Sequence, residues 1–160
     1  MESITVEIGT VVVTDEPTRL VMQGLGSCLG IFLYEDRKKI AAAAHVLLPS
    51  GPEKKMKERP GKYVESALRY MLEEIERRGG ERRHVRAKMA GGARMFHFDS
   101  REEHMTIGEQ NIHAAHEALA AHNIELVAHD TGGRQGRSLV VDTASGKIGV
   151  HTIRGPVTTL

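Results

Sequence analysis

Two short apolar segments joined by a charged turn constrain the fold more than any other feature of this 160-residue sequence. Residues 28–34 (CLGIFLY) are almost entirely apolar, and in residues 40–48 (IAAAAHVLL) the one ionisable side chain is His45. The five residues between them, 35–39, are all charged. Short apolar runs bounded by turn signals are typical of strands buried on both faces. We therefore expect an antiparallel hairpin within a layered structure.

The rest of the pattern predicts a single α/β domain over residues 1–160. Its sheets are expected to be mixed and largely antiparallel, because short turns join the early strands, and to be flanked by two main helices. The lysine-rich and proline-containing segment 50–61 is expected to be a mobile loop. Strands are predicted at 4–14, 19–25, 28–34, 40–48, 85–90, 124–129, 139–142 and 147–153, and helices from Lys62 to the Gly79–Gly80 pair and over 107–122.

Composition excludes several classes of function. The 22 basic and 21 acidic residues leave a net charge of +1, so nothing attracts the chain as a whole to nucleic acid or anionic lipid. Aromatic residues make up 4% and tryptophan is absent, which disfavours a base-stacking surface. The single cysteine cannot form an internal disulfide, and the N-terminus has no secretory signal pattern. We therefore expect a cytoplasmic protein with no nucleic-acid partner.

Cys28 is the first candidate for chemistry. It follows Gly24-Leu25-Gly26-Ser27, where glycines allow a sharp turn and leave room for a ligand. A thiol becomes a good nucleophile when a neighbouring base favours the thiolate. The alternative is that Cys28 is a small buried hydrophobic residue, since free cysteine is among the most buried residue types.

His45 is the second candidate, and the expected hairpin brings it near Cys28. A turn centred near residue 37 places Cys28 opposite about residue 46, so His45 falls within one position of the thiol. The alternative is a histidine whose hydrogen bonds are satisfied inside the core. His113, His116 and Glu117 could share a helix face and hold a metal, but metal sites usually need three or four ligands, and a solvated helix face is the favoured interpretation. No metal or other cofactor is expected.

Six ordered motifs then make the chain resemble the CheD family of chemoreceptor glutamine deamidases. The resemblance runs from about residue 5 to residue 153 and is specific because the motifs keep the family spacing. They are GLGSC at 24–28, AHVLLP at 44–49, KY at 62–63, KMAGGA at 88–93 followed by Met95-Phe96, IGxxN at 107–111 and DTGGxxxRS at 130–138.

This resemblance implies a layered α/β domain that converts selected receptor glutamines to glutamate, and in some members also hydrolyses glutamyl methyl esters. Cys28 matches the family nucleophile and His45 the family base. The implied substrate is the cytoplasmic domain of methyl-accepting chemoreceptors, so the protein would meet the membrane only through them. In some members the phosphatase CheC is a further partner, competing with the receptor for the same face.

One position departs from the family. A threonine often lies six residues before the cysteine, and Met22 stands there in this chain. Methionine cannot orient an imidazole, and strand alternation points the adjacent Gln23 to the other face. Ser27, a backbone carbonyl or a water could take over this role.

Backbone N–H groups around Gly26 and Ser27 are the expected donors to an oxyanion. Phe96 is an expected apolar anchor for a receptor helix, its alternative being a core side chain. Because Met22 replaces the threonine, the alternative function is a non-catalytic adaptor that binds chemoreceptors or a CheC-type phosphatase.

Overall fold

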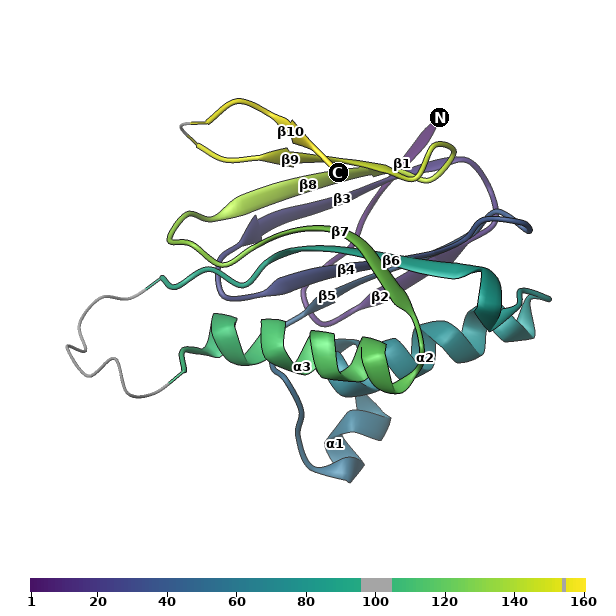
Figure 1. Cartoon of the computed structure of the whole chain (residues 1–160), viewed down its shortest axis with the longest axis horizontal. Helices are drawn as coiled ribbons and strands as arrows, with labels where there is room; N and C mark the ends of the chain where they lie inside the picture. The colour runs from purple at the N-terminus through teal and green to yellow at the C-terminus, as the bar shows by residue number, and fades with distance from the viewer. Residues whose placement is uncertain (96–104, 154) are drawn as a thin grey trace.

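The computed structural model describes residues 1–95, 105–153 and 155–160, and it consists of three layers (Figure 1). One five-stranded sheet lies on a second, and the helices cover the far face of the second sheet. The strands are β1 (Glu2–Thr5), β2 (Val11–Thr14), β3 (Thr18–Leu25), β4 (Leu29–Glu35), β5 (Ile40–Val46), β6 (Val85–Gly91), β7 (Glu125–Thr131), β8 (Arg137–Asp142), β9 (Lys147–His151) and β10 (Thr158–Thr159). The α-helices are α1 (Glu53–Glu58), α2 (Val64–Arg77) and α3 (Ile107–Ala121), and short 3-10 turns span Pro60–Lys62 and Arg82–His84.

The apolar hairpin forms the middle of the central sheet, whose strand order is β2-β5-β4-β6-β7. Strands β4 and β5 pair antiparallel across the charged turn, from Glu35 opposite Ile40 to Leu29 opposite Val46. Strand β6 pairs antiparallel with β4 and parallel with β7. The predicted hairpin is therefore confirmed.

Alternate residues of β4 and β5 serve two different cores, which explains why both strands are apolar throughout. One set packs on α2 and α3, and the other packs on the second sheet. The helix-facing core includes Leu29, Ile31, Leu33, Ala42, Ala44, Val46, Leu68, Met71, Leu72 and Ile75. The core between the sheets includes Leu20, Met22, Leu25, Cys28, Phe32, Ala41, Ala43, Leu139, Val141, Ile148 and Val150.

The second sheet has the order β1-β3-β8-β9-β10, and all of its neighbouring pairs except β1 and β3 are antiparallel. Both sheets are thus mixed and largely antiparallel, and α2 and α3 are the two long helices, as the sequence predicts. Asn123, with a φ of 56°, and Gly79, with a φ of 92°, follow the ends of these helices, where a left-handed residue terminates a helix.

Two expectations about secondary structure are wrong, and one short strand was not predicted. Residues 4–14 are not one strand, because the chain leaves β1 after Thr5, turns at Gly9 and enters the other sheet as β2. The segment 50–61 is not an irregular loop, since it contains α1 and the turn at Pro60. Strand β10 was not predicted, because a two-residue strand has no periodicity to detect.

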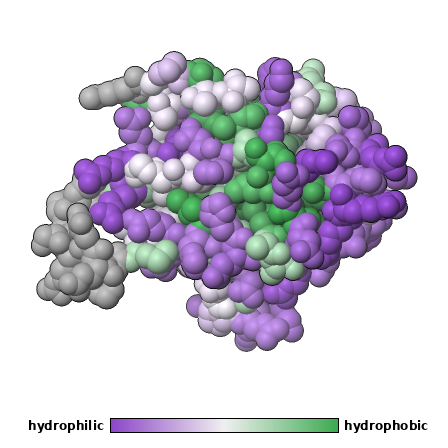
Figure 2. All heavy atoms as spheres, in the orientation of Figure 1, coloured by the Kyte–Doolittle hydropathy of each residue, from purple (hydrophilic) through white to green (hydrophobic). Residues whose placement is uncertain are grey.

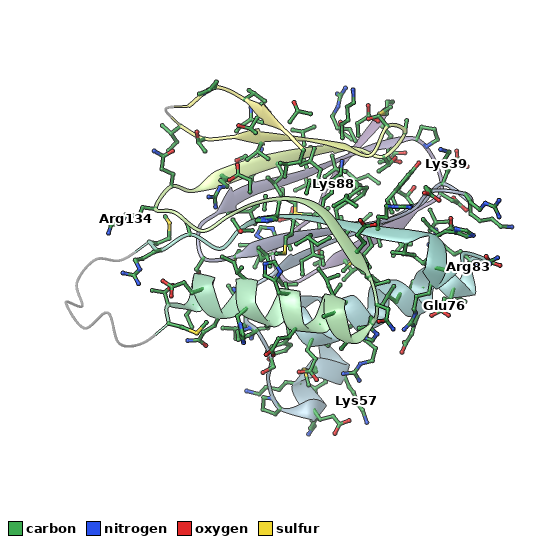
Figure 3. The ribbon with its side chains drawn as sticks, in the orientation of Figure 1. Lys39, Lys57, Glu76, Arg83, Lys88 and Arg134 are labelled. Carbon is green, nitrogen blue, oxygen red and sulfur yellow. The ribbon has the colours of Figure 1, made fainter. Side chains whose placement is uncertain are left out.

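Hydrophobic atoms that are visible on the face in Figure 2 gather in its middle, over the sheets, and hydrophilic atoms surround them. Lys39, Glu76 and Arg83 lie together at one end of the sheets, and Arg134 lies at the other (Figure 3). Within the described ranges, no helix has the length and apolar character needed to cross a membrane.

Candidate active site

Cys28 lies in the turn between β3 and β4, at the end of the sheets opposite the charged hairpin turn. Its side chain faces the core between the two sheets and is 6% exposed. Backbone hydrogen bonds hold the turn against the end of β6. The N–H of Gly92 donates to the Cys28 carbonyl and that of Ala93 to the Gly26 carbonyl, both at 2.8 Å. The nucleophile candidate therefore sits on a short, well-anchored segment.

His45 projects from β5 onto the same face of the sheet as Cys28. His45 pairs with Gly30, so continuing the register places Cys28 opposite Leu47, one residue away from the predicted partner. Cys28 and His45 are thus diagonal neighbours across the β4–β5 pair, close enough for long side chains to meet. Gly30, the residue opposite His45, has no side chain, and side chains of the second sheet occupy the space above it.

Gly30 lets the second sheet approach this pair closely. A Cβ atom at Gly30 would lie 2.7 Å from Leu139 Cδ1 and 2.9 Å from Met22 Sδ. Met22 is itself buried, whereas Gln23 is exposed, as strand alternation predicts. Met22 therefore covers the strand pair with an apolar side chain and gives His45 no polar partner.

A backbone carbonyl supplies the contact to the imidazole that the sequence left open. Val6, between β1 and β2, has its carbonyl oxygen 3.2 Å from His45 Nδ1. The backbone of His45 is also held, since its carbonyl accepts from Gly9 N–H at 2.7 Å and its N–H donates to Thr10 O at 3.2 Å. A carbonyl only accepts, so this contact selects the tautomer with the proton on Nδ1. The other ring nitrogen, Nε2, is buried with no hydrogen-bond partner among the described residues and is left as a base.

Burial keeps both groups neutral in the free protein. Desolvation raises the pKa of the Cys28 thiol above its ordinary value, and the backbone N–H of Cys28 lowers it by a smaller amount. Desolvation lowers the pKa of His45, partly opposed by the Val6 carbonyl and by the charge of Glu7. Both directions favour a neutral thiol beside a neutral imidazole over a resting thiolate–imidazolium pair.

The first expected result concerns the reactivity of the thiol. Alkylation of Cys28 by iodoacetamide should increase with pH to a midpoint above the ordinary cysteine value of about 8.5, because burial disfavours the thiolate. Cys28 is the single cysteine, so the mass of the intact protein reports the reaction without ambiguity. A midpoint below pH 7 would instead show a preformed ion pair.

The second expected result concerns stability at acid pH. His45 stays neutral in the folded protein to a lower pH than in the unfolded chain, so the unfolded chain binds more protons once the pH falls below about 6.5. The free energy of unfolding should fall in that range and be independent of this group above it. His122, whose pKa is also lowered by burial and then by nearby arginines, adds to the slope. Urea unfolding of His45→Gln and His122→Gln separates the two, and an unchanged slope in His45→Gln would contradict the assignment.

The turn also presents backbone donors. Ser27 and Cys28 lie outside the strands, and among the described residues no backbone hydrogen bond joins the N–H of either one to another residue. A groove of about 420 Å³ lies beside the turn, and it is lined by Gly24, Gly26, Met95, Gly136, Arg137, Ser138, His151, Thr152 and Ile153. Met95 is 43% exposed there. Phe96, the predicted anchor, lies outside the described residues.

On the predicted helix face, His113 pairs with Glu117 and His116 packs against a histidine of β7. His113 Nε2 lies 3.0 Å from Glu117 Oε1, and the ring of His116 packs edge-on against that of His129 at 5.9 Å. In the part of the chain that the structure describes, no three His, Cys, Asp or Glu side chains are grouped to hold a metal.

Two contributors to the site, Val6 and Gly30, were missed at the sequence level, and a third, Asn111, was named there only as part of the IGxxN motif. Val6 acts through its backbone carbonyl, a group that every residue has, so the sequence gives no sign of its role. Gly30 does give such a sign, because a glycine inside an apolar strand indicates close approach. Asn111, which reaches the Cys28 turn, is the polar member of the buried face of α3.

Comparison with known proteins places the chain in a family. Residues 47–152 match the family described as CheD chemotactic sensory transduction, and this match depends on neither Cys28 nor His45. A Geobacter metallireducens protein named "Probable chemoreceptor glutamine deamidase CheD 2" is 44% identical over 156 residues, covering 96% of each chain. A Clostridium novyi protein named "Probable chemoreceptor glutamine deamidase CheD" is 36% identical over 152 residues, covering 95% of this chain and 94% of that protein.

A Syntrophomonas wolfei protein of the same name is 39% identical over 137 residues, covering 86% of this chain and 85% of that protein. The family match over most of the chain and the near-complete alignments with individual relatives agree. This chain belongs to the CheD family.

Proposed function

We propose that this chain hydrolyses the side-chain amides of selected glutamines in chemoreceptors, with Cys28 as nucleophile and His45 as base. The observation that carries the proposal is the location of both side chains on one face of the β4–β5 pair. His45 Nδ1 is held by Val6 O, and Nε2 has no hydrogen-bond partner among the described residues. The names of the relatives, probable chemoreceptor glutamine deamidases, support the choice of substrate.

The reaction begins with a proton transfer from Cys28 Sγ to His45 Nε2 as sulfur attacks the amide carbon. The negative charge that forms on the amide oxygen is stabilised by the N–H groups of Ser27 and Cys28, and Gly26 keeps this turn compact. One such donor is typically worth about 10²–10³ in rate. The C–N bond then breaks, and the proton on Nε2 leaves with the nitrogen as ammonia.

A thioester between Cys28 and the substrate remains. His45 Nε2 takes a proton from water, the resulting hydroxide adds to the thioester carbon, and the C–S bond breaks to release glutamate and regenerate the thiol. A glutamyl methyl ester can follow the same path with methanol as the leaving group. All of these steps use groups of the chain and water.

The burial of Cys28 also favours a second candidate function. Its thiol is nearly enclosed, its pKa is raised by burial, and among the described residues no hydrogen bond joins Sγ to the His45 ring. An unreactive cysteine of this kind suits a non-catalytic adaptor that binds chemoreceptors or a CheC-type phosphatase.

One experiment separates the two functions. The purified protein is incubated with the cytoplasmic fragment of a chemoreceptor from its own source, and peptide mass mapping locates glutamines converted to glutamate. We expect conversion at specific positions that is absent without the protein. Binding of the fragment without any conversion would establish the adaptor and overturn the deamidase.

A further inference from the structure

Helix α3 carries a buried amide that the proposed reaction steps do not use. Asn111 is 0% exposed, and it shares its helix face with the apolar or small residues Gly108, Ala115 and Leu119. Buried polar side chains in native proteins are nearly always hydrogen-bonded to something specific. The contacts of Asn111 therefore indicate its role.

The amide nitrogen of Asn111 contacts the site from two directions. Nδ2 donates to the carbonyl of Ser27 at 3.0 Å and to that of Leu47 at 3.1 Å. Ser27 immediately precedes Cys28, and Leu47 follows His45 by two residues. A single NH₂ group thus joins the turn that carries the nucleophile to the strand end that carries the base.

These two hydrogen bonds lie where the backbone pairing of β4 with β5 ends. The last β4–β5 pair is Leu29 with Val46, and beyond it the N–H of Leu47 donates to the segment before α2 instead of to the Cys28 turn. On the β6 side, backbone N–H groups hold the Cys28 turn. On the β5 side, the side chain of Asn111 holds it among the described residues.

The helix that carries the amide is itself fixed in place. Gly108 packs so closely that a Cβ there would lie 2.5 Å from the carbonyl oxygens of Gly92 and of Ala93. Thr106 caps the helix through its side chain. Asn111, one turn further on, is therefore supported by backbone contact with the same segment that anchors Cys28.

The other half of the amide explains why this residue is not there for stability alone. Asn111 Oδ1 is buried and has no hydrogen-bond partner among the described residues. A buried acceptor without a hydrogen-bond partner lowers the stability of the folded state. This loss offsets part of the stabilisation that the two donated hydrogen bonds provide. The balance points to the donor group as the reason for an asparagine here.

We propose that Asn111 is a positioning residue that holds Cys28 in register with His45. It touches neither the substrate nor the reacting atoms, and it acts by fixing the separation of the two strands at the point where the nucleophile leaves the ladder. The kinetic part of its test rests on the proposed deamidase function, and the thiol-reactivity part does not.

The decisive experiment measures the alkylation rate of Cys28 by iodoacetamide at pH 7.5 in a double-mutant cycle. Asn111→Asp keeps the size of the side chain but turns the donor into an acceptor that faces two carbonyls. We expect it to slow alkylation at least about 10-fold, since a positioned general base contributes roughly 10²–10⁴. In the His45→Ala background the same substitution should change the rate no further, because the base it serves is gone.

A matched control removes another buried donor away from the site. Ser66 on α2 has its hydroxyl 2.7 Å from the Pro60 carbonyl and 3.4 Å from that of Tyr63. Ser66→Ala should lower the unfolding temperature without changing Cys28 reactivity. Asn111→Ser, whose hydroxyl can reach one carbonyl at most, is the second variant if Asn111→Asp does not fold, and we expect an intermediate rate.

The outcomes decide the proposal in either direction. Equal slowing in the presence and absence of His45, or wild-type reactivity in both folded Asn111 variants, would overturn it. With a receptor fragment, a positioning role predicts a fall in kcat of about 100-fold with little change in KM. If the wild type deamidates nothing, the proposed function fails, while the alkylation cycle still decides the role of Asn111.

Discussion

Replacing the nucleophile should abolish deamidation while the protein stays folded. In Cys28→Ala we expect the rate of glutamine conversion in a receptor fragment to fall by about 10⁴-fold or more, because no other group can form the thioester. The cost in stability should be about 1 kcal/mol, since a single buried sulfur atom is lost. Peptide mass mapping measures the first effect and urea unfolding the second.

A second variant tests whether the thiol itself is required. Cys28→Ser keeps the shape of the side chain but carries a hydroxyl, which ionises far less readily than a thiol. It should be as inactive as Cys28→Ala, because the apolar surroundings supplied by Met22 and Leu139 already disfavour an anion. Conversion of glutamine at the wild-type rate in either variant would show that Cys28 is not the nucleophile.

The other large effect is expected at Gly91, on the opposite side of the nucleophile from Asn111. Gly91 has a φ of 116°, and a Cβ there would lie 2.5 Å from the carbonyl oxygen of Cys28. Its own carbonyl accepts a hydrogen bond from Arg137 Nη1 at 3.0 Å, so it is held from β8 as well. Gly91→Ala must therefore displace the Cys28 turn or strain the end of β6.

A matched glycine separates backbone strain from displacement of the nucleophile. Gly79, with a φ of 92°, ends α2, and a Cβ there would have no neighbour within 4 Å. Both alanine variants should lose about 1–3 kcal/mol of unfolding free energy from the left-handed conformation. In Gly91→Ala we also expect kcat to fall about 100-fold, as for a displacement of the order of 1 Å. Equal kcat values in the two variants would show that Gly91 does not position Cys28.

The central hairpin could be predicted because its causes are local. Two apolar segments around a charged turn leave one arrangement in which both faces of each strand are buried, and antiparallel pairing then places Cys28 near His45. The prediction was one residue off in register, since the ladder pairs Gly30 with His45. Turn geometry determines such a shift, and the sequence does not specify closely which of the charged residues belong to the turn, since Glu35 pairs with Ile40 as part of the ladder.

The two long helices, α2 and α3, could also be predicted from the sequence. The apolar face of α2 and the residues that end α2 and α3 act within one or two turns, so their effect is readable from spacing alone. The division of residues 4–14 into two strands could not be predicted. Nothing local distinguishes one strand from two that join different sheets, because that choice depends on which partner strands are available.

The sequence by itself therefore determined the family, the layered α/β architecture and the two residues on which the proposed chemistry depends. Only the tertiary structure decided how those residues are held. The Val6 carbonyl reaches the imidazole from a segment 39 residues away, and Asn111 reaches the Cys28 turn from 84 residues away. Backbone carbonyls are the same in every residue type, and long-range contacts have no fixed spacing. For that reason the supporting contacts of the site appear only once the chain is folded.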